Sequence, residues 1–435
     1  MKKMKTLFIT VLVFAFLLAS SQAQEFEPNY EESKVPDYEL PDPLTFSDGS
    51  KVNTPSEWEE RRKEILRLFE KHVYGKMPGK PENLTFEERK NIPDALDGLA
   101  TLKEIRIHVK QNNQKHHFDL LLFIPNKPKK PVPVFLGLNF RGNQSVHPSK
   151  HITVTDSWVS NDENCNIQNN NATEASRGCR QNRFPVERIL DRGYALANIY
   201  YGEIDPDFDD GYQNGVHPLF DEEYLDTARG NNCASIGAWV WGLSRGADYL
   251  EKDPAIDNEK MAVLGHSRLG KTALWAGATD QRFDLVISNC SGCGGAALSR
   301  RQFGETVGRI NNSFPHWFCE NFKKYNQNEE ELPVDQHMLM ALMAPRPVIA
   351  ASAKQDQWAD PKGEFLSVKH AAPVYKLLGK KGLPVEEMPV INRPVYNTTG
   401  YVIRNGDHDL NNYNWEVYLD FADHHFDYNR LLNQD

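Results

Sequence analysis

The 435-residue chain is acidic, with 60 Asp and Glu against 50 Lys and Arg and a formal net charge of −10. Its composition, 40% hydrophobic and 25% charged, is typical of a globular protein with ample material for a buried core. The acidic balance argues against nucleic acid or an anionic membrane as a partner, so an anionic substrate would need a local cationic patch.

The first 23 residues have the pattern of a secretory signal peptide. Three lysines within the first five residues precede an apolar run over 7–18, and Ser21-Gln22-Ala23 forms a small-x-small cleavage site. The apolar run is too short to span a bilayer. We therefore expect cleavage after Ala23 and a secreted or periplasmic mature protein.

Six cysteines in an exported chain permit disulfides. Cys165 and Cys179 flank an Asn-rich stretch, and a bond between them would close a loop. Cys290 and Cys293 form a C-x-x-C pair that does not stand at a helix start. For that pair we favour packing or structural bridging over a redox or metal role.

A helix is predicted to begin at Pro55. Thr54-Pro55-Ser56-Glu57 is a capping box with proline at the first helical position, and apolar residues then recur on one face until Gly75 and Pro78. Further on, the segments 105–109 and 118–124 alternate or run apolar, as the two strands of a hairpin do.

From residue 132 onward, short apolar runs alternate with helical patterns. The runs cover 132–138, 194–199, 261–264, 285–289, 348–352 and 401–404, and the helical patterns fall near 233–251, 268–279, 364–379 and 413–427. This alternation predicts an α/β fold with a mostly parallel central sheet and helices on both faces.

We expect one catalytic domain over 24–435, with long loop insertions near 140–183 and 202–232. Both insertions follow strand ends, and sheets of this kind place their chemistry at the carboxyl ends of their strands. The two loops are therefore expected to surround the same site.

Ser267 stands in the corner between a predicted strand and a helix. A serine in such a corner projects its hydroxyl above the sheet, where the free N–H groups of the helix, including that of Arg268, can stabilise an oxyanion. The sequence departs from Gly-x-Ser-x-Gly because Leu269 stands at the second glycine position and Gly270 follows it. The alternative is a serine that only caps a helix.

A serine hydrolase of this kind needs an acid and then a histidine after the serine in the chain. His408 lies on a glycine-containing loop after the last predicted strand, whereas later histidines fall in a helical pattern. Asp356 is the acid nearest the end of the strand 348–352 and is the favoured partner of His408. Asp360 stays an alternative, although it could instead cap the helix that begins near Pro361.

Together these stretches resemble the glucuronoyl esterases, carbohydrate esterase family fifteen. Gly265-His266-Ser267-Arg268-Leu269-Gly270-Lys271 is similar to the family signature Gly-x-Ser-Arg-x-Gly-Lys, and "SGCGGAALSRR", "GETVGRINNSFPHWF", "MALMAPRP", "QDQWADPKGEF" and "NGDHDL" match in the same order. The resemblance implies an α/β-hydrolase fold without metal or cofactor. It also implies cleavage of the ester between lignin alcohols and the 4-O-methyl-glucuronic acid branches of xylan.

The resemblance also implies roles for individual residues. By position, the family's nucleophile, general base and oxyanion-holding arginine correspond to Ser267, His408 and Arg268, and its uronate-binding residues to Lys271, Glu305 and Trp358.

One stretch departs from part of the family. Some members place their catalytic acid in a Glu-Ser-Gly motif where this chain has Cys290-Ser291-Gly292. A neutral thiol cannot stabilise an imidazolium, so the acid is expected from Asp356 instead. The segment Leu138–Gly142, after an early strand, lies where hydrolases often supply a further oxyanion donor.

The expected partner is glucuronoxylan or a lignin–carbohydrate ester, bound by a monomer that contacts neither nucleic acid nor membrane. Two alternatives remain open. One is an acetyl or feruloyl xylan esterase that uses the same triad, and the other is a non-catalytic carbohydrate-binding protein with a hydrolase fold.

Overall fold

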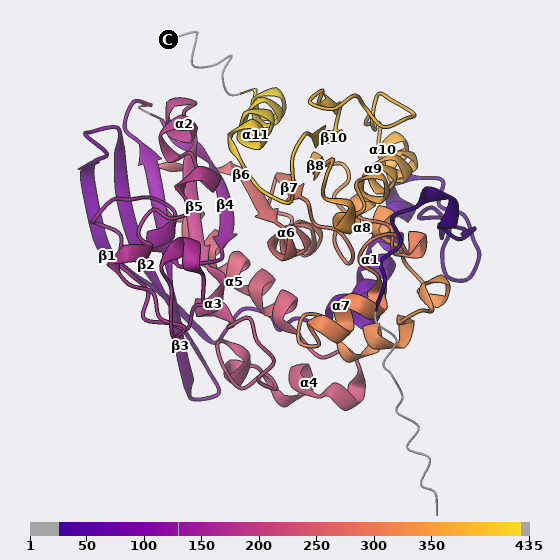
Figure 1. The fold of residues 1–435 in the computed structure, drawn as a ribbon, viewed down its shortest axis with the longest axis horizontal. Helices are drawn as coiled ribbons and strands as arrows, with labels where there is room; N and C mark the ends of the chain where they lie inside the picture. The colour runs from indigo at the N-terminus through magenta and orange to yellow at the C-terminus, as the bar shows by residue number, and fades with distance from the viewer. Residues whose placement is uncertain (1–25, 129, 428–435) are drawn as a thin grey trace, which may run out of the picture.

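The computed structural model describes residues 26–128 and 130–427 (Figure 1), so the expected signal peptide lies outside the described residues. A ten-stranded sheet runs through the molecule in the order β1-β2-β3-β5-β4-β6-β7-β8-β10-β9. Its strands are β1 (Asn83–Ala95), β2 (Ala100–Gln111), β3 (Gln114–Pro125), β4 (Val132–Asn139), β5 (Ala195–Tyr200), β6 (Ile256–His266), β7 (Leu285–Asn289), β8 (Val348–Ala353), β9 (Val395–Tyr396) and β10 (Thr399–Arg404).

The centre of this sheet is parallel, and its two edges are antiparallel. Strands β5, β4, β6, β7, β8 and β10 run in one direction, whereas β1 to β3 and β9 add antiparallel pairs. The predicted hairpin corresponds to β2 and β3, and each apolar run from residue 132 onward is a strand. The predicted α/β fold is confirmed. Strand β1 was missed because most of its side chains are exposed or half-exposed and polar.

The helices fall between the strands, as the alternating pattern predicts. They are α1 (Pro55–Phe69), α2 (Val186–Asp191), α3 (Tyr201–Ile204), α4 (Glu222–Leu225), α5 (Ser235–Leu250), α6 (Arg268–Thr279), α7 (Val307–Ser313), α8 (Gln336–Ala341), α9 (Pro361–His370), α10 (Ala372–Leu377) and α11 (Asn412–Phe426). The pattern near 364–379 is divided between α9 and α10. Among the described helices, none is long and apolar enough to cross a membrane.

Each face of the sheet has its own apolar core. In β8, Val348 and Ala350 pack with the residues of α5, α6 and α9, whereas Ile349 and Ala351 pack with those of α2 and α11. This alternation follows from the period of two along a strand. Figure 1 shows α2 and α11 on one side of the central strands and α5 and α6 on the other. The central strands are buried on both faces, which is why they read as continuous apolar runs.

Helix α1 begins as its sequence predicts. The Thr54 hydroxyl accepts the N–H of Glu57 at 3.2 Å, and the Glu57 carboxylate accepts the N–H of Thr54 at 3.0 Å, which completes the capping box. The helix continues into a π turn over Glu70–Tyr74 and stops at Gly75, whose φ of 82° suits glycine.

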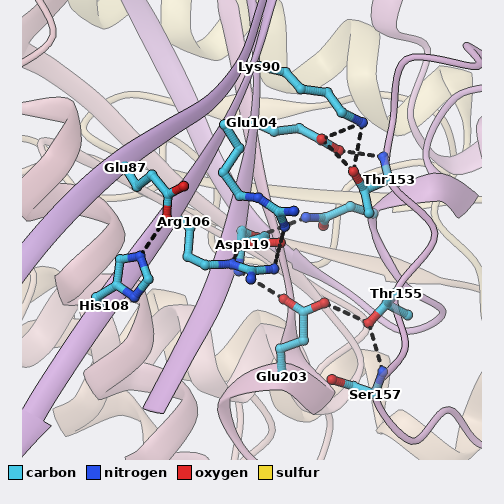
Figure 2. Close-up of polar contacts among 12 residues, drawn as sticks. Glu87, Lys90, Glu104, Arg106, His108, Asp119, Thr153, Thr155, Ser157 and Glu203 are labelled. Carbon is cyan, nitrogen blue, oxygen red and sulfur yellow. Dashed lines mark hydrogen bonds and ion pairs between the residues drawn. The ribbon is translucent and has the colours of Figure 1, made fainter. Parts of the chain in front are cut away.

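The segment 140–183 contains only short helical turns and two isolated β-bridges, but it is anchored at several points. Cys165 and Cys179 form a disulfide, the pairing that their positions suggest. Figure 2 shows two further anchors, where Thr153 and Thr155 meet carboxylates from β2 and α3. The Thr153 hydroxyl donates to Glu104 at 2.7 Å and that of Thr155 to Glu203 at 2.6 Å.

Candidate active site

Ser267 occupies the turn between β6 and α6. Its backbone has φ 60° and ψ −130°, a conformation that serine rarely adopts. The turn is closed by a hydrogen bond from the N–H of Gly270 to the Ser267 carbonyl at 2.8 Å. It also requires glycine at position 265, because a Cβ there would lie 1.8 Å from the Leu269 carbonyl oxygen. Strain of this kind is characteristic of functional sites.

His408 and Asp356 come together at the carboxyl edge of the sheet. The Nδ1 of His408 lies 2.6 Å from Oδ2 of Asp356. The two residues follow β10 and β8, which are parallel neighbours, so their loops leave the sheet side by side. Asp356 is buried, whereas 41% of the His408 side chain is exposed. A buried carboxylate that binds Nδ1 orients an imidazole whose Nε2 is left for chemistry.

Asp360, the alternative acid, is held elsewhere. Its carboxylate accepts the N–H of Gly363 at 3.0 Å and so caps α9, as the sequence suggests for this residue. It also pairs with the Arg301 guanidinium at 2.8 Å. These bonds leave Asp356 as the acid that contacts His408.

A cavity of about 380 Å³ brings the predicted residues together. Its wall includes Ser267, Arg268, Lys271, Glu305, Asp356, Trp358 and His408. We call it the first cavity. The favoured catalytic residues and the three predicted uronate-binding residues therefore all line one cavity.

Lys271 is buried in this wall, one helical turn after Ser267. Its ammonium donates to the carbonyl oxygens of Ser291 and Cys293, both at 2.6 Å, and lies 3.6 Å from Oε2 of Glu305. An ammonium and a carboxylate side by side can donate to one sugar hydroxyl and accept from the next.

Glu305 and Trp358 are joined through the backbone. The N–H of Glu305 donates to the Trp358 carbonyl at 3.0 Å. The preceding Gly304 has φ 64°, and a Cβ there would lie 2.5 Å from the same carbonyl oxygen, so this approach requires glycine. The half-buried Trp358 ring packs edge-on against Phe26 with 6.1 Å between ring centroids. A fixed aromatic ring of this kind can pack against a sugar.

Arg268 is positioned by residues that the sequence did not indicate. Its guanidinium contacts the carboxylate of Asp207 and lies over the Trp317 ring, with 4.5 Å to the centroid. Asp207 also contacts His316 at 3.0 Å and the Trp317 indole at 2.7 Å. Burial alone would lower the pKa of Arg268, but the carboxylate of Asp207 more than offsets it, so the pKa is raised. Arg268 therefore stays a fixed cation beside Ser267.

The segment Leu138–Gly142 reaches Ser267, and its role as a source of a further oxyanion donor stays a prediction. Phe140 and Arg141 line a cavity with Ser267, which brings the segment to the serine. The buried Asn139 side-chain amide donates to the side-chain oxygens of Asn143 and Asn198, both at 2.8 Å. Asn139 thus supports the loop through these buried amide bonds.

A buried carboxyl group contacts Cys290-Ser291-Gly292, the stretch that differs from the Glu-Ser-Gly motif of some family members. Glu364 of α9 accepts the N–H groups of Ser291 at 2.7 Å and Gly292 at 3.0 Å. Burial raises the pKa of Glu364 to about 7. No local pattern separates Glu364 from its acidic neighbours, because the two N–H groups that it accepts lie about 70 residues away in the chain.

One group of possible metal ligands occurs among the described residues. Atoms of Cys290, Asp356 and His408 lie within 4.8 Å of one another. Burial, followed by the nearby carboxylates of Glu364 and Asp356, raises the pKa of the Cys290 thiol well above its ordinary value. Metal binding needs a thiolate and a neutral imidazole, so this chemistry favours a hydrogen-bonded acid–histidine pair over a metal centre.

Comparisons with known proteins agree with this geometry. A family model described as "Glucuronyl esterase, fungi" matches residues 223–379. The structure of a promiscuous CE15 esterase from a marine bacterial metagenome is 49% identical, with a TM-score of 0.87 and coverage of 92% of this chain and 100% of that one. A glucuronoyl esterase from Solibacter usitatus is 44% identical, with a TM-score of 0.84 and coverage of 90% and 98%. This chain belongs to the glucuronoyl esterases, carbohydrate esterase family fifteen.

A more distant relative extends the comparison to fungi. A 4-O-methyl-glucuronoyl methylesterase of Schizophyllum commune is 28% identical over 380 residues, which cover 85% of this chain and 81% of the relative. The family resemblance and the α/β-hydrolase fold that the sequence predicts are both confirmed, and the chain is an esterase of this family.

Proposed function

We propose that this protein is a serine esterase that cleaves the ester between 4-O-methyl-glucuronic acid branches of xylan and lignin alcohols. One observation carries the proposal: the strained Ser267 turn lines the same cavity as Lys271 and the His408–Asp356 pair. Within that pair, Nδ1 of His408 lies 2.6 Å from Oδ2 of Asp356. Family membership supports the same substrate class, since the Schizophyllum commune relative is named a 4-O-methyl-glucuronoyl methylesterase.

The proposed reaction begins with proton transfer. Ser267 gives its hydroxyl proton to His408 and attacks the carbonyl carbon at C6 of the uronate, while Asp356 stabilises the imidazolium that forms. Collapse of the tetrahedral intermediate breaks the bond to the alcohol oxygen, which takes the proton from His408. Water then gives a proton to the same imidazole and attacks the acyl-enzyme. The acid is released, and the proton returns to Ser267.

Charge stabilisation in this scheme comes from Arg268 and the N-terminus of α6. The oxyanion develops beside a guanidinium that Asp207 holds in place, so little reorganisation is needed when the charge appears. Lys271, Glu305 and Trp358 are proposed to bind the uronate ring. Their contacts are the same for the ester and for the acid product, so they set specificity more than rate.

We further propose that this single catalytic domain is exported after cleavage at Ala23 and acts as a monomer. The Cys165–Cys179 disulfide supports an oxidising compartment, because such bonds persist outside the cytosol.

The test compares wild-type kcat/KM for the methyl esters of glucuronate and galacturonate. Because Lys271 and Glu305 are proposed to bind ring hydroxyls, the glucuronate ester should be cleaved with clearly higher efficiency. Benzyl glucuronate and acetylated xylan form the second pair, and higher efficiency on the acetyl substrate would instead establish a xylan acetyl esterase. Binding to glucuronoxylan without turnover of any of these esters would establish a non-catalytic protein.

A further inference from the structure

A second cavity, of about 290 Å³, shares Ser267, Arg268 and His408 with the first but is otherwise lined by different elements. Three arginines of the segment 140–183 line this cavity: Arg141, Arg180 and Arg183. No arginine other than the shared Arg268 lines the first cavity among the described residues. The two cavities that meet at the serine therefore differ in charge.

Positive charge exceeds negative charge around the second cavity. Arg141 donates to Asp162 at 2.7 Å, and Arg180 contacts the same Asp162 oxygen, so one carboxylate faces two guanidiniums. Arg183 pairs with Asp409 at 2.8 Å, and Arg268 pairs with Asp207. Four guanidiniums thus line the cavity and pair with three carboxylates, of which Asp207 alone is in the lining, so the arginines outnumber their acidic partners by one.

The arginines also keep free donors. Within the described part of the chain, the Arg183 side chain donates from Nε alone and that of Arg180 from one terminal nitrogen. Burial lowers the pKa of Arg183, and the nearby cations Arg180 and Arg141 lower it further against the opposing effect of Asp409. The site therefore has a positive field as well as unused N–H groups.

These side chains are held in place before any ligand arrives. The side chains of Arg141, Arg180 and Arg183 are only 20%, 21% and 21% exposed. The segment that carries Arg141 and Arg180 contains the Cys165–Cys179 disulfide and is fixed to β2 through Glu104 and to α3 through Glu203 (Figure 2). Groups that are ordered in advance lose less entropy on binding.

The proposed function, on which this inference rests, gives the first cavity to the uronate. The remaining half of the ester, its alcohol, then lies in the second cavity, where His408 can protonate the departing oxygen. Phe140 and Tyr201 also line this cavity and offer aromatic surface to a ring.

We propose that the second cavity binds the alcohol half of the ester and selects alcohols that carry a carboxylate. Arginine is suited to this ligand, because its planar N–H groups match the two oxygens of a carboxylate. The site would supply the cationic patch that an acidic protein needs in order to hold an anion.

The test uses three glucuronate esters of matched shape, those of benzyl, 4-carboxamidobenzyl and 4-carboxybenzyl alcohol, with the wild-type protein. We expect kcat/KM for the carboxylate ester to exceed that for its neutral amide by roughly tenfold, the effect of one charge-assisted contact. Added salt should lower this ratio, because it screens the field. A ratio of one or below in the wild type would overturn the inference, whatever the variants do.

Variants assign the effect to the cavity. Arg180→Gln should reduce the ratio of the two efficiencies severalfold, whereas Arg188→Gln should leave it unchanged. Arg188 is a matched control, since it pairs with Glu416 on the surface and does not line the cavity. An equal ratio in wild type and Arg180→Gln would contradict the assignment. Failure to cleave any of the three esters would instead overturn the glucuronoyl esterase proposal, and this inference with it.

Discussion

The two cavities that meet at Ser267 are built in different ways. The first is assembled from the sheet edge and α6, and its charged pair, Lys271 and Glu305, is neutral overall and tied to backbone groups. The second is formed largely by the long segment 140–183 and carries a net positive charge. On the proposed function, the part of the site nearest the core binds one neutral sugar ring, whereas the loop side is free to differ in the alcohol that it accepts.

The largest effect is expected from the loss of the Ser267 hydroxyl, which both cavities share with Arg268 and His408. Ser267→Ala should lower kcat by roughly 10⁴-fold or more on every ester, because no nucleophile remains. Circular dichroism should show an unchanged fold, and isothermal titration should still detect glucuronate. Retention of wild-type turnover would place the nucleophile elsewhere.

Asp356→Asn should have the next largest effect. The amide cannot stabilise a charged His408, so kcat should fall roughly 10³- to 10⁴-fold on both neutral and carboxylate-bearing alcohols. Asp360→Asn is the matched control. It should lower the thermal midpoint, because it weakens the cap of α9 and the pair with Arg301, while kcat changes little. The opposite pattern would make Asp360 the triad acid.

Arg268→Gln removes the guanidinium that lies between the two cavities. Loss of an oxyanion donor should lower kcat by roughly 10²- to 10³-fold, with a much smaller change in KM. Asp207→Asn should lower kcat by less, since it loosens Arg268 without removing it. A large rise in KM with unchanged kcat would instead make Arg268 a substrate-binding residue.

Glu305→Gln should affect one cavity only. Loss of the charged acceptor is expected to raise KM for methyl glucuronate by roughly 10-fold or more and to reduce the preference over galacturonate. The ratio between carboxybenzyl and carboxamidobenzyl esters should stay at its wild-type value. A change in that ratio would mean that the two cavities are not independent.

The smallest expected effect is on the pH dependence of the free energy of unfolding, through the buried Glu364. Burial raises the pKa of Glu364 to about 7 from an ordinary value of 4.5, so the folded protein favours the neutral acid. Its stabilising contribution is complete below the ordinary pKa and is lost as the pH rises through about 7. From about pH 5 to about pH 8, this group should remove roughly 2–3 kcal/mol from the free energy of unfolding.

Glu364→Gln should abolish that part of the pH dependence in chemical denaturation. Glu203, which anchors the loop of the second cavity, also has its pKa raised to about 7 by burial, and Glu203→Gln should have a similar effect on stability. Only Glu203→Gln should also alter the discrimination between alcohols. Equal pH dependence in wild type and both variants would rule out this origin.

The sequence predicted the parts of this site that depend on local pattern. Ser267 and His408 follow strands that are buried on both faces, and such strands stand out as apolar runs. Asp356 and Asp360 could not be separated in this way, because only the approach of the loops after β8 and β10 decides which carboxylate meets His408.

Other residues needed the folded chain. Asp207 lies 61 positions before Arg268 in an irregular segment, where an aspartate has no distinguishing neighbours. Arg141, Arg180 and Arg183 come together only because the segment 140–183 folds back on itself. Long-range contacts between loops leave no hydrophobic period in the sequence, whereas strands and helices are predicted from that period.

In the proposed mechanism, the position of the half-exposed His408 imidazole decides whether release of the alcohol or hydrolysis of the acyl-enzyme comes first. It lines both cavities, so the water that ends the cycle reaches it through space that the alcohol has just left. Departure of the first product must then precede hydrolysis of the covalent intermediate. An alcohol held firmly by the arginines would be cleaved efficiently at low concentration, yet it would slow the cycle at saturation and compete with the incoming water.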